Sequence, residues 1–458
     1  MFGAIFTNSF GILFSRILGF LRDLFMASIL GANIYSDIFF VAFKLPNLFR
    51  RIFAEGAFTH KSIFAVNIFL IFLSIILILT LFVNLLPQLI TQLIGMGFSK
   101  ETIQMASPFV AINFWYLPLI FSVTFLSGIL QYKHHFATTA FSTALLNISL
   151  IGALLFSQHS EKLEIVYYLS YGVVIGGILQ LIVHLITLQR LHLHILLLGG
   201  LKYLQKKSHF IQKDIKKFQK NFFPAMWGNS TAQVSAFLDT LLASFLVSGS
   251  ISYLYYANRI FQLPLALFAI ATSVALFPKI ARYLKNNDHT KALLYLKKAF
   301  WFLVFLLGAS TIGGIVLAHE IIWLLFQRGA FHANDTQNTA LVLQIYLLGL
   351  LPFGLQKLFS LWLYAKEMQL QAAKIATFSL ITYIVTALLL ITPFGVGGLA
   401  FASTLSGMVS LFFTIKLFGK ENFFQLLSLK YTLYFIGGSA IFIVFLLQIQ
   451  KLLTQYIS

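Results

Sequence analysis

Apolar stretches of membrane length recur along the chain, separated by short polar connections. About 20 apolar residues in a helix, at ~1.5 Å per residue, are enough to cross the hydrocarbon core of a bilayer. The composition agrees, because 59% of the 458 residues are hydrophobic, 10% are charged and the mean hydropathy is +0.88. The sequence therefore predicts an all-α polytopic membrane protein.

On this length criterion we expect thirteen spans. They lie near residues 7–30, 35–60, 64–87, 107–131, 136–157, 165–188, 221–248, 252–278, 298–318, 338–365, 370–392, 396–416 and 430–450. Four parts follow: an N-terminal six-helix half (1–190), a basic amphipathic connector (191–220), a C-terminal six-helix half (221–418) and an extra C-terminal transmembrane helix (419–458). The first span carries charges and lacks a cleavage site, so it is not a cleavable signal peptide.

Two short motifs occur at equivalent places in both halves. FKLP at 43–46 and FQLP at 261–264 each lie in a second span, and Leu-Pro at 117–118 and at 351–352 each lies in a fourth span. Together these pairs favour a parallel pseudo-repeat of six plus six helices, as in transporters built from two halves.

Most of the 32 Lys and Arg residues fall in alternate connections, on one side of the predicted membrane. Basic connections stay on the cytoplasmic side. The amino terminus and the connector are therefore expected in the cytoplasm, and the carboxyl terminus outside. Some basic residues lie within spans instead: Arg16, Arg22, Lys44, Arg259 and Lys357.

Charges inside the first two spans need an explanation, because a central Arg or Lys costs about 2.5–3.5 kcal/mol and such groups usually face a bundle interior or a watered cavity. Arg16 and Asp23 lie about 20° apart on a helical wheel, and Asp37 and Lys44 share a face in the same way. One interpretation is two structural ion pairs. The other is an anion receptor, since basic groups outnumber acids here and an Arg side chain binds phosphate through a bidentate fork.

Five segments together resemble the lipid II flippase family (MurJ, also called MviN) of the multidrug/oligosaccharidyl-lipid/polysaccharide exporter superfamily. They are SRILGFLRD (15–23), SDIFFVAFKLPNLFRRIFAEGAF (36–58), YYANRIFQLP (255–264), ALFPKIAR (275–282) and RGAFHANDTQNTA (328–340).

The resemblance implies a flippase without an ATPase motif. It would move lipid II, the lipid-linked peptidoglycan precursor, from the inner to the outer leaflet of the bacterial cytoplasmic membrane by alternating access, in the service of cell wall biogenesis. A cationic central cavity would hold the substrate diphosphate. Implied substrate-binding residues are Arg16, Arg22, Asp37, Arg50, Arg259 and Ser252. Further cavity or gating candidates are Asp23, Lys44, Arg51, Glu55, Asn258 and Gln262.

The chain departs from the family pattern in two places. Asn258 and Gln262 stand where relatives commonly have Asp and Glu. The implied cavity therefore loses acidic side chains, while its excess of basic side chains remains. The family usually has fourteen helices, the last two forming a groove for the lipid tail, whereas only one such helix is expected here.

No cofactor is expected. The resemblance offers one candidate ion site, at Asp239, which matches an acid of a sodium site in some relatives; the expected partner span provides only hydroxyls, from Thr382, Tyr383 and Thr386. The membrane potential is the alternative energy source. The absence of cysteine excludes a disulfide or thiolate metal site, and no phosphate-binding P-loop motif is present, so ATP is not the direct fuel.

The expected partners are lipid II and the phospholipid bilayer, not nucleic acid, and protein partners are not indicated. Two other functions stay open. One is export of another polyprenyl-diphosphate oligosaccharide or of drugs, although a site for drug cations should display acids. The other is a membrane-embedded transferase, for which the loop at 328–335 is the only plausible host of a catalytic group.

Overall fold

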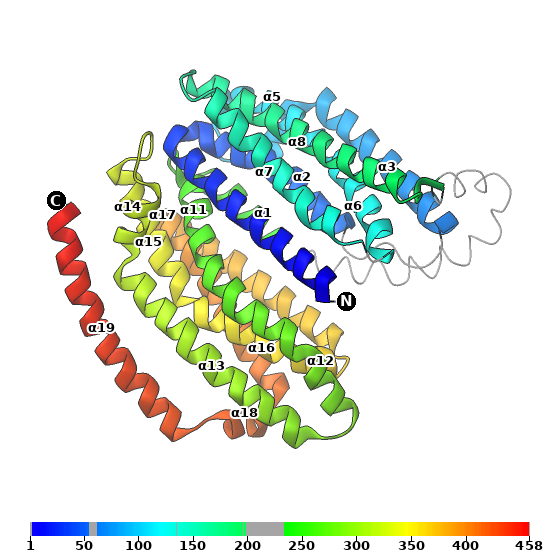
Figure 1. The fold of residues 1–458 in the computed structure, drawn as a ribbon. Helices are drawn as coiled ribbons and strands as arrows, with labels where there is room; N and C mark the ends of the chain where they lie inside the picture. The colour runs from blue at the N-terminus through cyan, green and yellow to red at the C-terminus, as the bar shows by residue number, and fades with distance from the viewer. Residues whose placement is uncertain (1, 55–61, 134, 196, 198–232, 458) are drawn as a thin grey trace. The chain divides into compact units, whose positions relative to one another are not determined.

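The structure, a computed structural model, describes residues 2–54, 62–133, 135–195, 197 and 233–457. All regular elements in these ranges are helices (Figure 1). The chain forms two compact units. The first comprises Met1–Gly249 with Arg328–Phe331, and the second comprises Ser250–Gln327 with His332–Ser458. The prediction of an all-α protein is confirmed.

The first unit contains nine described helices, of which α5 and α6 are the most deeply buried. Phe109, Phe114, Phe121 and Phe125 of this pair are at most 1% exposed. The helices are α1 (Phe2–Ile29), α2 (Ile34–Ala54), α3 (Ser62–Leu85), α4 (Pro87–Ile94), α5 (Lys100–Phe114), α6 (Tyr116–Tyr132), α7 (Ala137–Phe156), α8 (Lys162–Arg190) and an unlabelled helix at Gln233–Ala243.

The second unit is built around α15 and α16. Its elements are α11 (Ser250–Pro264), η1 (Leu265–Ile270), α12 (Ala271–Lys285), α13 (His289–Val316), α14 (Ala318–Phe326), α15 (Ala333–Leu348), α16 (Leu350–Ala365), α17 (Gln369–Phe418), α18 (Lys420–Leu426) and α19 (Leu429–Ile457). Pro264 has no amide hydrogen to donate to the preceding turn, and the chain continues from it as the π-helix η1.

Eight helices among the described residues are long and apolar enough to cross a membrane, or nine if the bent pair formed by α3 and α4 counts as one span. The charged helices α1 and α2 are not in this total. α17 counts once, although its 50 residues would measure about 75 Å. Gly395, with φ of 53°, divides it where the sequence predicts a boundary between two spans.

Both units interrupt a central span at equivalent places. α5 ends at Phe114 and α15 ends at Leu348, each four residues before a proline, Pro118 or Pro352. A proline cannot donate a hydrogen bond to the carbonyl four residues earlier, which explains why the helix breaks there. A short helix also follows the third span in each case, α4 after α3 and α14 after α13. The predicted pseudo-repeat is therefore visible in the order of the elements.

The predicted connector at 191–220 lies mostly outside the described residues, so its boundaries stay a prediction.

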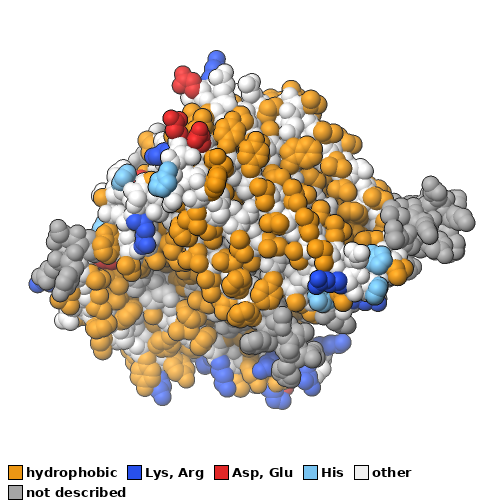
Figure 2. Space-filling view, turned by 45° about the horizontal axis from the view of Figure 1, so that its top comes forward, with side chains coloured by type: hydrophobic (Ala, Val, Ile, Leu, Met, Phe, Trp, Pro, Cys, Tyr) orange, Lys and Arg blue, Asp and Glu red, His pale blue; other side chains and the backbone are white. Residues whose placement is uncertain are grey.

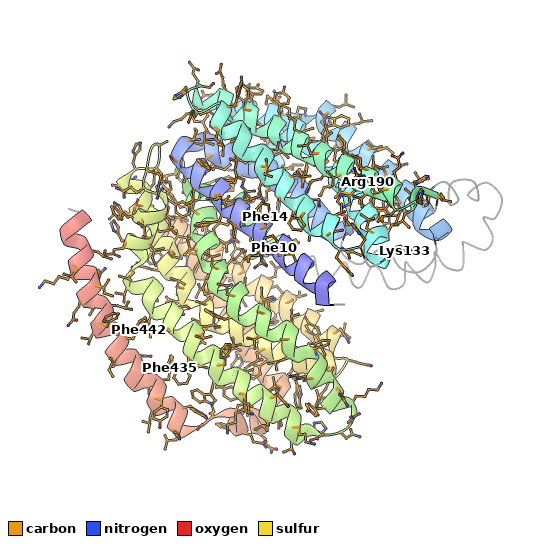
Figure 3. The ribbon with its side chains drawn as sticks, viewed as in Figure 1. Phe10, Phe14, Lys133, Arg190, Phe435 and Phe442 are labelled. Atoms are coloured by element: carbon orange, nitrogen blue, oxygen red, sulfur yellow. The ribbon has the colours of Figure 1, made fainter. Side chains whose placement is uncertain are left out.

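The expected extra C-terminal helix is α19, which packs along α13 (Figure 3). Phe435 lies over Gly308, where an added Cβ would come within 2.5 Å of the ring, and Phe442 faces Gly313. The opposite side of α19 is apolar and exposed. In the space-filling view, hydrophobic side chains cover most of the visible face, and Lys and Arg gather mainly along its lower margin (Figure 2).

Candidate substrate site

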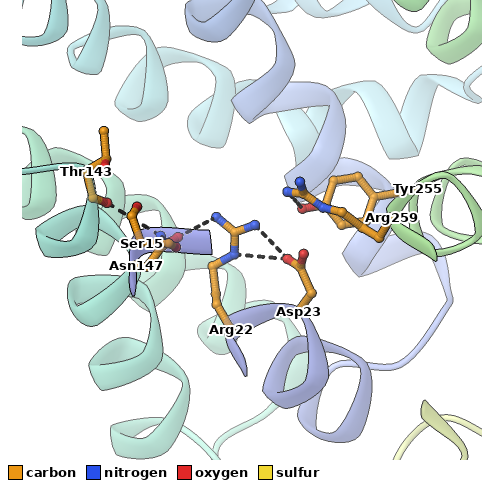
Figure 4. Close-up of polar contacts among 7 residues, drawn as sticks. All are labelled: Ser15, Arg22, Asp23, Thr143, Asn147, Tyr255 and Arg259. Carbon is orange, nitrogen blue, oxygen red and sulfur yellow. Dashed lines mark hydrogen bonds and ion pairs between the residues drawn. The ribbon is translucent and has the colours of Figure 1, made fainter. Parts of the chain in front are cut away.

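Arg22 and Asp23 form a buried ion pair on α1 (Figure 4). The Arg22 Nη2 and Nε atoms lie 2.6 Å and 3.0 Å from Asp23 Oδ1, and the two residues are 6% and 1% exposed. The helical wheel had suggested Arg16 as the partner of Asp23. In the structure, Asp23 instead pairs with the adjacent Arg22. Adjacent residues point about 100° apart around a helix, but the arginine side chain is long enough to span that separation.

Asn147 of α7 holds the other end of the Arg22 guanidinium. Its Oδ1 atom accepts a hydrogen bond from Arg22 Nη1 at 3.0 Å, and its Nδ2 donates to the carbonyl oxygens of Ser15 and Thr143 (Figure 4). The amide thereby ties α7 to α1 and orients the arginine. Asn147 is not among the site residues predicted from the sequence. The signal that could have pointed to it is an amide side chain in the middle of an apolar span.

Arg16 differs from Arg22 in its surroundings. Its side chain is exposed and forms no ion pair within the described part of the chain. One turn further on, Gly19 faces the Asn147 amide, which an added Cβ would meet at 3.5 Å. The α1 surface that packs on α7 therefore carries Gly19 and Arg22, and Arg16 lies beside it.

The predicted site residues of α2 are only partly described. Asp37 is 2% exposed, and its Oδ2 atom accepts a hydrogen bond from the backbone amide of Gly249 at 2.8 Å. Lys44 is half-buried. Glu55 and the side chains of Arg50 and Arg51 lie outside what the structure describes.

In the second unit, the predicted residues form one polar stripe along α11. Ser252, Tyr255 and Arg259 follow one another at helical spacing, so they share a face. Arg259 Nη2 donates to the Tyr255 hydroxyl at 2.7 Å, and its Cζ lies 4.9 Å from the centroid of the Tyr255 ring (Figure 4). Tyr255, which was not among the predicted site residues, orients Arg259 through both hydrogen bonding and cation–π attraction.

The two residues that depart from the family pattern pair with each other. Gln262 Nε2 donates to Asn258 Oδ1 at 3.1 Å, one turn apart on α11. Gln262 is exposed and Asn258 is half-buried. Neither amide adds charge, so the local charge on this stripe comes from Arg259.

The residues of the candidate ion site lie in different compact units, so each is described by itself. Asp239 is half-buried on the helix Gln233–Ala243, and the Thr382 hydroxyl donates to the carbonyl of Phe378 in its own helix at 3.0 Å. Across the described residues, no group of three His, Cys, Asp or Glu side chains is placed to hold a metal ion. A sodium site at Asp239 stays a prediction.

Comparison with known proteins settles the family. The sequence model of the family described as lipid II flippase MurJ matches residues 26–458. The chain belongs to the MurJ lipid II flippase family. This match starts after Arg16, Arg22 and Asp23, so it does not cover these three residues of the first helix.

Named relatives agree with the family assignment. The probable lipid II flippase MurJ of Helicobacter pylori is 53% identical over 417 residues, which cover 87% of this chain and 91% of the relative. The probable lipid II flippase MurJ of Haemophilus influenzae is 30% identical over 446 residues, covering 90% and 85%.

A solved lipid II flippase MurJ in an inward closed conformation superposes with a TM-score of 0.77 at 25% identity, over 98% of this chain and 99% of that one. An inward-facing multidrug resistance MATE transporter of the MOP superfamily aligns with a TM-score of 0.59 at 13% identity over 92% of this chain and 94% of that one, a likeness of fold alone. Membership of the MurJ family makes this chain a multi-span membrane protein of the bacterial inner membrane.

Proposed function

We propose that this MurJ-family protein translocates lipid II from the inner to the outer leaflet of the cytoplasmic membrane by alternating access of its two halves. The observation that carries the proposal is the excess of basic over acidic side chains on its apolar spans. Arg16, Arg22, Lys44, Arg259 and Lys357 lie on spans, against Asp23, Asp37 and Asp239. A substrate with a diphosphate supplies the missing negative charge.

The contacts of Arg259 suit anion binding. Tyr255 is neutral, so it orients Arg259 without cancelling its charge, whereas Asp23 offsets the charge of Arg22, which the neutral Asn147 also holds. A guanidinium held in a fixed orientation favours bidentate contact with phosphate oxygens. Arg16 and Arg50 are proposed to add to the same cationic cavity, with Asp37 and Ser252 as polar contacts.

An in-cell experiment tests this function. Depletion of the protein should leave lipid II accumulated and inaccessible to a membrane-impermeant enzyme that cleaves lipid II from outside, and re-expression should restore cleavage. Unchanged cleavage during depletion, in cells that lack any other lipid II flippase, would refute the proposal.

We also propose that the membrane potential drives export. Moving one charge across 100 mV is worth ~2.3 kcal/mol, so a doubly negative head group leaving a negative interior gains about twice that, less any charge that protein arginines carry with it. Collapse of the potential should therefore slow export, whereas exchange of sodium for potassium at fixed potential should change it little. A strict sodium requirement that Asp239→Asn abolishes would instead establish an ion site.

Two other functions fit the observations less well. The relatives are named lipid II flippases, and the likeness to drug exporters is one of fold alone. A membrane-embedded transferase needs a catalytic carboxylate or histidine at the water–lipid boundary. In the one candidate loop, Asp335 instead accepts hydrogen bonds from the His332 backbone and the Tyr253 hydroxyl.

A further inference from the structure

Lys357 is a charged residue of the predicted spans to which neither the fold nor the proposed site gives a role. It lies on α16, within the 33-residue span Ala333–Ala365. α16 is buried on most of its circumference, with Leu355, Leu358, Phe359 and Trp362 at most 7% exposed. A lysine on such a central helix is costly unless it reaches water or an anion.

The exposed side chains of α16, Lys357 and Tyr364, lie on one face. Together with Phe353 they form a stripe whose members fall within about 40° of one another on the helix. Phe353 is half-buried, and Lys357 and Tyr364 are exposed, although Ser360 and Leu361 between them are buried. The stripe therefore becomes accessible toward the end of α16 at which the sequence predicts the cytoplasm.

Phe353, at the start of this stripe, faces another helix of its own unit. The ring centroid of Phe353 lies 5.9 Å from that of Phe261 on α11. Gly354 beside it packs against Ala269 of η1 and Leu307 of α13. The Lys357 side chain itself is exposed.

No acidic side chain neutralises Lys357 among the described residues. Asp288 pairs with Lys291, Asp335 bonds to Tyr253 and His332, and Glu320 bonds to Gln450. The two other acids of the second unit, Glu367 and Glu421, lie outside the membrane spans near helix ends. A positive charge on a largely buried helix, with no acidic partner among the described residues, is suited to an anionic ligand.

We propose that the Lys357 ammonium binds an anionic oxygen of the transported head group, either of its diphosphate or of its peptide carboxylates. The inference rests on the proposed function and adds a contact from the fourth span of the C-terminal half. A competing explanation is that the side chain snorkels to the cytoplasmic interface, since Lys357 lies about 12 Å before the end of α16. Snorkelling requires no ligand, so the two explanations predict different effects of removing the charge.

Lys357→Met keeps most of the stem and removes the charge. In liposomes containing the purified full-length protein, we expect this variant to translocate lipid II about tenfold more slowly than the parent, the loss expected for one charge-assisted hydrogen bond. Lys357→Arg should be intermediate, and Lys374→Met, an exposed lysine of α17, should match the parent. Full activity of Lys357→Met beside an active parent would overturn this inference alone, whereas an inactive, folded parent would overturn the proposed function as well.

A chemical rescue guards against a folding defect. The chain has no cysteine, so Lys357→Cys offers a single thiol. Attaching an aminoethyl group to it should restore translocation, and attaching a methyl group should not. Equal results with both reagents would contradict a role for the charge.

A substrate that lacks the peptide identifies the anion that Lys357 binds. The Lys357→Met measurement is repeated with a polyprenyl-diphosphate sugar without a peptide. A defect that persists indicates the diphosphate, and a defect that disappears indicates the peptide carboxylates.

Discussion

At the scale of single residues, Asn147 is the most informative side chain, because it connects Arg22 to the backbone of α1 and α7. Asn147→Leu keeps the volume but removes every one of these hydrogen bonds. Loss of a hydrogen bond to a charged group costs about 1.5–3 kcal/mol. We expect both Asn147→Leu and Arg22→Ala to lower growth support, measured in depleted cells at matched protein abundance.

The control for this experiment is Thr143→Val. Thr143 contributes only its carbonyl oxygen to Asn147, so the substitution leaves that contact in place. A defect in Thr143→Val equal to that of Asn147→Leu would show that packing of α7, and not the orientation of Arg22, is what matters.

Tyr255 provides a second prediction at this scale. Tyr255→Phe retains the ring beneath Arg259 and removes the hydroxyl that accepts from Nη2 at 2.7 Å. We expect this variant to translocate lipid II about tenfold more slowly than the parent, since one hydrogen bond to a charged group is lost. Arg259→Ala should translocate no lipid II. Wild-type rates in Tyr255→Phe would mean that the cation–π contact alone orients the arginine.

The sequence draws attention to the candidate charges but not to their partners. Arg22, Asp23 and Arg259 are conspicuous because charge is expensive in an apolar span. Their neutral partners carry no such cost, and Asn147 lies 125 positions away from Arg22. Only tertiary packing brings that amide to α1.

At the scale of elements, the loop at Arg328–Phe331 illustrates how backbone geometry constrains sequence. Ala330 donates its amide hydrogen to the Ser28 carbonyl at 2.7 Å. Gly329, with φ of +59°, lies so close to the same carbonyl that an added Cβ would collide with it. This loop is part of the first compact unit although both of its flanks belong to the second.

Gly329→Ala should therefore destabilise the protein. The left-handed backbone conformation alone costs a non-glycine residue about 1–2 kcal/mol, and the collision with Ser28 adds to it. We expect a melting temperature several degrees below the parent in detergent. Gly437→Ala on α19 is the matched control, because nothing lies within 4 Å of its added Cβ; an equal fall in both variants would contradict the argument.

Helix breaks were partly predictable at this scale. The Leu-Pro pairs of the fourth spans were visible in the sequence, and the loss of a backbone donor at each proline accounts for the ends of α5 and α15. The bend of 96° between α3 and α4 was not predicted, since an apolar stretch with a proline at its edge is equally compatible with a straight span.

At the scale of the whole molecule, topology is the first quantity to measure. α11, η1 and α12 form one span from Ser250 to Lys285, so the exposed residues Ser248 and Asn286 at its two ends must lie on opposite sides of the membrane. In the cysteine-free chain, we expect Ser248→Cys to react with an impermeant thiol reagent in intact cells, and Asn286→Cys only after permeabilisation. The reverse pattern would invert the proposed orientation.

Fold class was predictable from apolar length alone, whereas the division into compact units was not. The repeat assigns the helix Gln233–Ala243 to the C-terminal half, yet by contacts it belongs to the first unit. Within that unit, Gly97 donates its amide hydrogen to Ser244 at 3.0 Å and packs against Phe245. Such contacts between distant segments leave no local pattern in the sequence.

The most direct test of the proposed function is lipid II exchange between leaflets, measured with purified protein in liposomes that hold a membrane potential. The cationic site predicts exchange well above that of protein-free liposomes, slowed by collapse of the potential and abolished by Arg259→Ala. A folded protein that exchanges no lipid II under these conditions, or an Arg259→Ala variant that exchanges it at the full rate, would contradict the account.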